Sequence, residues 1–230
     1  MTFGPIARIS LASALMALAV QGSAAAGADT YVVDPAHSSA RFQVPHLLYS
    51  TLWVISKVSG RFTGIQGTLR LDPADIARSS VEVVIDAASI ATGEPFRDYE
   101  LRGSRFFDVA RYPAITFKSS SVTDLANGRL AVAGTLTMHG VSRPVVIAVS
   151  GWGTGPGKEA GSARAGFSKG TLRLDKRDYG LTAMIGPQPV CDQVEITLSL
   201  EACHAQSAPN DQSLQIRKDC QGKRGLPIIE

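Results

Sequence analysis

The chain has 230 residues, of which 44% are hydrophobic and 19% charged, so it can bury a sizeable core and is neither disordered nor collagen-like. Its 23 Lys and Arg against 20 Asp and Glu leave a net charge of +3 without any long basic run, so we expect no nucleic-acid partner. With 22 glycines and 7% aromatic residues, the composition favours one turn-rich β domain.

The first 26 residues are organised like a secretory signal peptide. Arg8 precedes an apolar run over 9–20, and Ala24 and Ala26 supply the small side chains that signal peptidase requires. The apolar run is too short to span a bilayer, and no longer one follows. We therefore expect cleavage after Ala26, or after Ala28, and an exported periplasmic protein without a stable membrane span. A transient membrane contact stays open, and so does the alternative of a buried N-terminal helix.

Short runs of alternating apolar and polar residues extend from residue 31 to about residue 202. Gly, Pro, Asn and Asp bound these runs, which is typical of antiparallel strands joined by turns. The expected strands lie at 31–34, 38–44, 60–72, 81–86, 115–118, 130–138, 145–149, 165–174 and 193–202. About eight strands with one apolar face each can close a small barrel and leave no exposed edge. The sequence therefore predicts an all-β fold, an eight-stranded antiparallel barrel.

Three segments interrupt the alternation. Residues 94–107 are amphiphilic without a period of two and predict a short helix and loop that caps one barrel mouth. Residues 151–161 predict a glycine-rich hairpin tip, and the polar residues 204–230 predict a disordered tail. The expected domains are a signal peptide at 1–26, a barrel at 27–203 and the tail.

One face of each predicted strand carries Val, Leu, Ile, Met and Phe, and we expect this face to point into the barrel. Because few of these side chains are large aromatics, the lumen leaves room for a small ligand. The residues expected to line the lumen are Phe42, Phe62, Val83, Ile85, Phe106, Phe107, Ile115, Phe117, Val132, Leu136, Met138, Ile147, Phe167, Ile196 and Leu198.

The sequence contains no recognisable catalytic or metal-binding motif. His37, His46, His139 and His204 are not at HxH or HExxH spacing, and no Gly-x-Ser-x-Gly occurs. Carboxylates occur singly, so no glycosidase pair is indicated. We expect a protein that is not an enzyme, binds no metal and needs no cofactor.

Two polar motifs admit a functional and a structural interpretation. Asp34, His37 and Ser38 could belong to a catalytic triad, but Asp34 and Ser38 are also the residues expected at a turn between two strands. The charged residues 97–105 are expected to form a solvated helix face, with a lid that contacts a ligand headgroup as the alternative.

Export into an oxidising compartment raises the question of disulfides among Cys191, Cys203 and Cys220. An extended strand over 193–202 would hold Cys191 and Cys203 far beyond the ~7 Å between Cα atoms that a disulfide allows. If an intramolecular disulfide forms, we expect it to join Cys203 to Cys220.

Ordered motifs run through the whole strand region. They include Tyr31-x-x-Asp34-Pro35-x-His37-Ser38, Ser59-Gly60-Arg61-Phe62, Val81-x-Val83-x-Ile85-Asp86, Phe106-Phe107-Asp108-Val109, Met138-His139-Gly140-Val141 and Asp178-Tyr179-Gly180-Leu181. Over about residues 31–202 the chain resembles the YceI-like family, exported lipocalin-like proteins that bind polyisoprenoid chains. The resemblance implies a lipocalin-like barrel whose lumen holds an isoprenoid tail with the headgroup near the mouth. Residues 48–55 look like a small insertion relative to the family, and the extension after Ala202 is also unusual.

We therefore expect a periplasmic carrier that holds an isoprenoid lipid, such as a prenol, a prenyl phosphate or an isoprenoid quinone. Two alternatives stay open. An enzyme acting on such a lipid would need titratable groups facing the lumen, and a structural barrel without a ligand would have a filled interior. A homodimer also stays open.

Overall fold

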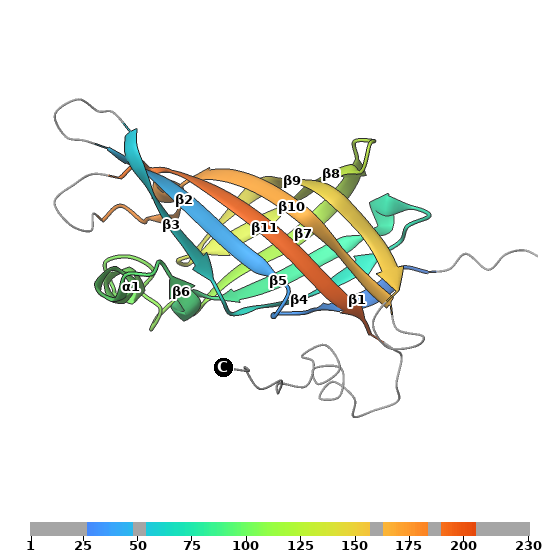
Figure 1. Ribbon diagram of the computed structural model, residues 1–230, viewed down its shortest axis with the longest axis horizontal. Helices are drawn as coiled ribbons and strands as arrows, with labels where there is room; N and C mark the ends of the chain where they lie inside the picture. Colours follow the sequence, from blue (N-terminus) through green and yellow to red (C-terminus); the bar gives the residue numbers. More distant parts are fainter. Residues whose placement is uncertain (1–26, 48–53, 157–162, 184–189, 206–230) are drawn as a thin grey trace, which may run out of the picture.

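The computed structural model describes residues 27–47, 54–156, 163–183 and 190–205 (Figure 1). Its strands are β1 (Asp29–Val33), β2 (Ser39–Leu47), β3 (Val54–Phe62), β4 (Ile65–Leu71), β5 (Ser80–Asp86), β6 (Ile90–Ala91), β7 (Ala114–Asp124), β8 (Arg129–Met138), β9 (Val141–Pro156), β10 (Ala163–Asp175) and β11 (Gln193–His204). The helix α1 spans Pro95–Arg102, and short 3-10 helices occur at Ile76–Arg78, Ala87–Ser89 and Lys176–Tyr179.

The strands form one antiparallel sheet that closes into a barrel. The order around it is β1, β4, β5, β7, β8, β9, β10 and β11, and β11 pairs with β1 to close the ring. β11 also pairs with β2, and β2 pairs with β3, so β1–β2 and β3–β4 act as two long strands with a break in each. The closed eight-stranded barrel expected from the sequence is therefore confirmed.

Several expected boundaries differ from the structure. Residues 60–72 belong to two strands, because the chain breaks at Thr63 and Gly64 between β3 and β4. Of the hairpin tip expected at 151–161, Gly151–Pro156 continue β9, because their main chain pairs with β10 and a strand ladder needs no side chains, while 157–161 lie outside the described residues. At the other end of the chain, β11 extends to His204, the first residue of the expected tail.

Other expectations fall on residues that the structure does not describe. The signal peptide at 1–26 lies outside the described residues, as do residues 48–53 of the expected insertion and the tail from residue 206 onward.

Two β-bulges keep apolar side chains directed inward along the longest strands. In β7 the register shifts between Ser119 and Ser121, so that Phe117 and Val122 are both buried although their positions have opposite parity. A second register shift lies between Phe167 and Gly170 of β10, so the inward-facing residues on its two sides also have opposite parity. The bulges allow long strands to curve around a continuous interior.

The helix α1 has clear start and stop signals. The Glu94 carboxylate accepts hydrogen bonds from the backbone N–H groups of Phe96 and Arg97 at 3.1 and 2.6 Å, and Pro95 occupies the first turn. Gly103 follows the last residue of the helix. Its eight residues are too few for independent stability, so contacts with the barrel must hold it.

Side chains of α1 provide those contacts. Arg102 donates hydrogen bonds to the carbonyl oxygens of Ala88 and Ile90 at 2.8 and 2.7 Å, and Asp98 accepts from the Thr92 backbone N–H at 2.8 Å. Because β6 also pairs with β3, α1 is fixed beside the end of the barrel where β2 and β3 emerge (Figure 1). The expected helix and loop at this mouth are confirmed.

Within the described ranges, no helix combines the length and apolar character that crossing a membrane requires.

Candidate functional site

An apolar cavity of about 590 Å³ lies inside the barrel. It extends from Phe167 and Leu200 in the barrel wall to Phe96 and Leu101 of α1 at the mouth. Its volume is within the ~300–1,000 Å³ typical of sites that enclose a small molecule. The barrel is therefore not a filled structural core.

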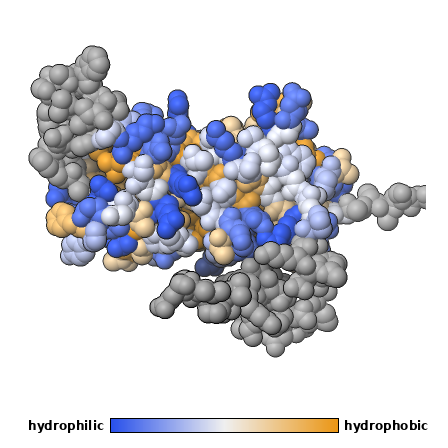
Figure 2. Space-filling model, in the orientation of Figure 1, coloured by the Kyte–Doolittle hydropathy of each residue, from blue (hydrophilic) through white to orange (hydrophobic). Residues whose placement is uncertain are grey.

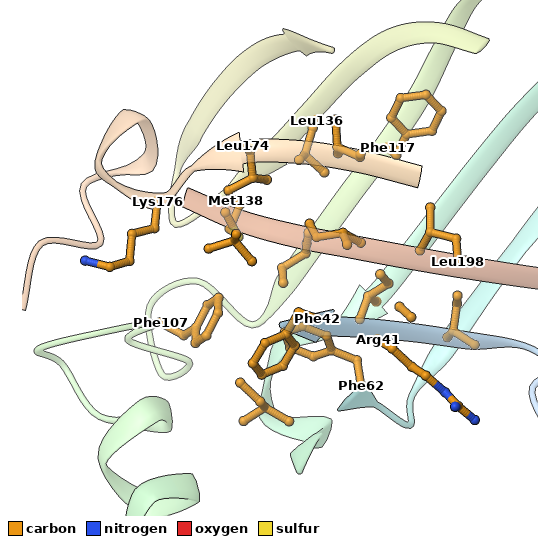
Figure 3. A pocket seen from close by; sticks show the side chains of 18 of the residues that line it. Arg41, Phe42, Phe62, Phe107, Phe117, Leu136, Met138, Leu174, Lys176 and Leu198 are labelled. Carbon is orange, nitrogen blue, oxygen red and sulfur yellow. The ribbon is translucent and has the colours of Figure 1, made fainter. Parts of the chain in front are cut away.

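Every residue expected to line the lumen lines this cavity. Figure 3 shows some of them, including Phe42, Phe117 and Leu136. The set comprises Phe42, Phe62, Val83, Ile85, Phe106, Phe107, Ile115, Phe117, Val132, Leu136, Met138, Ile147, Phe167, Ile196 and Leu198. The structure thus brings together side chains from most strands of the barrel. That they bind a ligand stays a prediction.

Other apolar residues complete the wall and were not predicted. They are Ala40, Val44, Val58, Ile65, Val81, Ile90, Phe96, Leu101, Val149, Leu172, Leu174, Leu181, Val190, Val194 and Leu200. Alternation could have identified many of them, because Val81 precedes Val83 by two residues and Leu172 and Leu174 alternate in β10. Phe96 and Leu101 come from the helix, where a period of two gives no signal.

Three phenylalanines form a connected group near the mouth (Figure 3). The ring centroids of Phe42 and Phe62 are 5.8 Å apart, and those of Phe62 and Phe107 are also 5.8 Å apart, at an interplanar angle of 89°. A Cβ atom on Gly60 would lie 2.3 Å from the Phe42 ring, so glycine at this position makes room for the ring. The group presents rigid apolar surface to an occupant of the cavity.

Four charged residues, Arg41, Glu94, Arg97 and Lys176, border the cavity, and none reaches its interior as a free group. Arg41 points away from the apolar side chains in Figure 3, and Glu94 caps α1. Arg97 donates to the Thr92 hydroxyl at 2.8 Å.

Lys176 borders the cavity with its aliphatic stem. Its Nζ donates to the carbonyl oxygen of Leu181 at 3.2 Å and lies 2.8 Å from Oδ1 of Asp192. The side chain is only 11% exposed, so this is a largely buried cation with its partners in place. The charged groups of the cavity are thus confined to its border, and those of Glu94, Arg97 and Lys176 have partners within the chain.

The histidine motif at 138–141 serves the barrel itself. His139 donates from Nδ1 to the carbonyl oxygen of Tyr179 at 3.0 Å, and its ring meets Tyr112 edge-on at 4.8 Å between centroids. Tyr179 is 1% exposed, and burial, reinforced by the charge of Asp178, raises the pKa of its hydroxyl. These contacts join the β8–β9 turn to the end of β10, which is a structural role.

Asp34, His37 and Ser38, which could form a triad according to the sequence, lie at the turn between β1 and β2. Asp34 is fully buried, and its carboxylate accepts from the Ala36 backbone N–H at 3.0 Å and from His37 Nδ1 at 2.7 Å. Arg164 lies 3.8 Å from the same carboxylate, while the Ser38 hydroxyl donates to the carbonyl oxygen of Glu201. The hydrogen bond from the Ala36 N–H to the Asp34 carboxylate is the contact that the turn interpretation predicts, and the Ser38 hydroxyl bonds the main chain of β11.

The described residues include no candidate metal site and one free cysteine. Among the described residues, no group of three or more His, Cys, Asp or Glu could hold a metal ion. Cys191 is a free, half-buried thiol. Cys220 lies outside the described residues, so its pairing with Cys203 stays a prediction.

Known proteins are similar to this chain over the part that forms the barrel. The model of the YceI-like domain family matches residues 31–202. A UPF0312 protein of Vibrio cholerae is 42% identical over 162 residues, which cover 70% of this chain and 82% of the relative.

Two solved structures share the fold. The crystal structure of Burkholderia cenocepacia BcnA is 24% identical, with a TM-score of 0.60 over 74% of this chain and 99% of that chain. A polyisoprenoid binding domain from Saccharophagus degradans, implicated in plant cell wall breakdown, is 20% identical, with a TM-score of 0.52 over 76% of this chain and 98% of that chain.

Proposed function

Because the chain belongs to the YceI-like family, we propose that the protein is a carrier that holds a polyisoprenoid lipid in its barrel. The observation that carries the proposal is the apolar cavity of about 590 Å³, whose polar groups lie only at its border. The expected ligand classes are a prenol, a prenyl phosphate or an isoprenoid quinone. The polyisoprenoid binding domain from Saccharophagus degradans, which has the same fold, supports this ligand class.

Hydrocarbon burial is sufficient to hold such a ligand. At ~0.8 kcal/mol per buried CH₂, two isoprene units of about ten carbons offer several kcal/mol before ordering costs are subtracted. Few polar contacts are then needed, in keeping with a wall formed by Val, Ile, Leu, Met and Phe side chains.

The border of the cavity suggests the orientation of the ligand. The deep lumen, between Phe117 and Phe167, has an apolar lining that suits an isoprenoid tail, whereas the charged residues Arg97 and Lys176 lie at the mouth, where a polar headgroup would stay near water. We therefore propose that the tail enters first and the headgroup stays near α1.

We propose binding rather than catalysis, without a cofactor. An enzyme acting on the lipid tail would need a titratable group in the deep lumen, whereas the charged residues that border the cavity lie at its edge. His37 and His139 are engaged in the turn and strand contacts described above.

The test is to purify the full chain, extract it with organic solvent and identify the released molecules by mass spectrometry. A prenol, prenyl phosphate or quinone at near-equimolar yield supports the proposal. Recovery of no lipid, together with failure of the extracted protein to bind an added long-chain prenol, overturns it. Conversion of the added prenol to a new product favours the enzyme.

We also propose that the protein works in the periplasm, since residues 1–26 are organised like a signal peptide. N-terminal sequencing of the periplasmic form should give Gly27 or a residue within two positions of it. Met1 on the periplasmic protein contradicts this part of the proposal.

A further inference from the structure

We propose that the end of the barrel that carries α1 docks on an anionic lipid bilayer. The docking surface consists of an aromatic pair, Phe96 and Tyr99, and a basic group, Arg41, Lys57 and Arg61. The inference rests on the proposed function and deepens it, because a lipid carrier must load and unload at a membrane.

The aromatic pair lies on the outside of α1. Phe96 is 66% exposed and Tyr99 is 72% exposed, and their spacing of three residues places both on one face of the helix. Phe96 also lines the cavity, so the exposed face is continuous with the lumen. Figure 2 shows hydrophobic surface at the end of the molecule where α1 lies in Figure 1.

This surface differs from the other exposed apolar side chains of the described residues. Val84, Leu125 and Val146 are aliphatic and lie singly on different elements. Aromatic side chains with a polar atom, such as Tyr99, favour the level of lipid headgroups. The aromatic pair is therefore suited to a bilayer surface rather than to open water.

The basic group lies on the outer face of the hairpin formed by β2 and β3. Arg41 and Arg61 are directly opposite each other in the β2–β3 ladder, and both are exposed. Neither forms an ion pair with another described residue. Because like charges opposite each other are unfavourable, an external anion would stabilise this arrangement.

Lys57 adds a further exposed cation on β3, with Nζ 3.2 Å from the Gln43 side-chain oxygen. β3 pairs with β6, and β6 contacts α1, so the basic group and the aromatic pair lie on neighbouring elements at one end of the barrel (Figure 1).

The charges favour a bilayer over a second copy of this chain. The charged residues within α1 balance, and the three cations of the basic group outnumber the single carboxylate of Glu94 at the N-cap, so the docking surface carries a net positive charge. Two copies joined through this surface would bring their basic groups together, whereas lipid phosphates neutralise them. A cation at an anionic membrane surface contributes about fivefold to the binding constant.

The experiment measures flotation of the full mature chain with lipid vesicles. Vesicles of phosphatidylcholine and phosphatidylglycerol in equal parts should bind the protein, and binding should weaken as salt is added. Vesicles of phosphatidylcholine alone should bind it at least tenfold less.

Matched variants locate the surface. The double substitution Arg41→Gln and Arg61→Gln should reduce binding to the mixed vesicles by more than tenfold, and Tyr99→Ser should reduce it severalfold. The controls Arg70→Gln and Leu125→Ser change exposed residues away from α1 and should leave vesicle binding unchanged.

The outcomes separate this inference from the proposed function. Tyr99 does not line the cavity, so Tyr99→Ser should bind a soluble prenol as the wild type does. Equal vesicle binding by all variants, or a wild-type dimer that Tyr99→Ser dissociates, overturns membrane docking and leaves the carrier proposal standing. Vesicle binding that follows the variants, without lipid in the cavity, supports docking and overturns the carrier.

Discussion

Filling the cavity should abolish ligand binding without unfolding the barrel. Leu136 and Val132 of β8 are buried and line the cavity, whereas Thr135 between them is exposed on the outer face. We expect Leu136→Trp and Val132→Phe to occupy space that a prenyl tail would use.

The expected loss of affinity follows from how much of the ligand's hydrocarbon the larger side chain displaces from the cavity. At ~0.8 kcal/mol per buried CH₂, a larger side chain that excludes only two carbons of the ligand costs ~1.6 kcal/mol, which is more than tenfold in Kd. The added atoms enter an existing cavity rather than a close-packed core, so the free energy of unfolding should change by less than ~1 kcal/mol.

The assay is titration of the solvent-extracted protein with a long-chain prenol, alongside urea unfolding of each variant. Thr135→Phe serves as the outward control and should bind as the wild type does. Normal binding by both inward variants would show that the ligand is not in the barrel. Impaired binding by Thr135→Phe alone would mean that the faces of β8 are reversed.

Three further predictions concern the framework of the barrel. Tyr179→Phe should leave the free energy of unfolding unchanged or raise it in urea titration, because the buried Tyr179 hydroxyl has no hydrogen-bond partner among the described residues; a loss above ~1 kcal/mol would reveal one. Gly140→Ala should lower that free energy by ~1–2 kcal/mol, since Gly140 has a φ of 75° and a Cβ there would lie 2.6 Å from the Tyr112 ring; unchanged urea unfolding would contradict this. Hydrogen bonds from Arg177 lower the pKa of Asp175 from 3.8 to about 2, so their stabilisation is present above the unfolded pKa and lost as the pH falls through about 2. The urea midpoint of Asp175→Asn should accordingly lie below that of the wild type at neutral pH and converge with it toward pH 2, and a constant difference would refute the assignment of the shift.

The lumen was largely predictable because the interior of a barrel imposes a period of two on each strand. Phe117 and Leu136, for example, lie on the apolar parity of their strands and are neighbours across the β7–β8 ladder. The bulge in β10 explains why Phe167 was predicted to face the lumen whereas Leu172 and Leu174, which lie beyond the bulge on the opposite parity, were not. Once a bulge adds a residue, parity counted from one end of a strand fails at the other end.

The parts that alternation could not predict depend on the main chain or on tertiary contacts. Gly151–Pro156 are rich in glycine and lack a strand pattern, yet their backbone pairs with β10. Phe96 contributes to the cavity because Arg102 and Asp98 fix α1 against β6, a placement that no local pattern encodes. Lys176 borders the cavity with its aliphatic stem while its ammonium group pairs with Asp192, and a charged residue type gives no sequence signal for such a position.

The barrel can close during folding only when β11 is available, because β11 pairs with strands on both of its sides. β11 joins β10 on one side and both β1 and β2 on the other, so it connects the two ends of the described chain. Until β11 is available, the strands before it form an open sheet with unpaired edges and a water-exposed apolar face. Contacts between such distant segments carry a high entropic cost, and proteins dominated by them refold on a scale of milliseconds to seconds. We expect refolding to be limited by docking of β11, and a chain truncated before Gln193 to aggregate rather than form a smaller barrel.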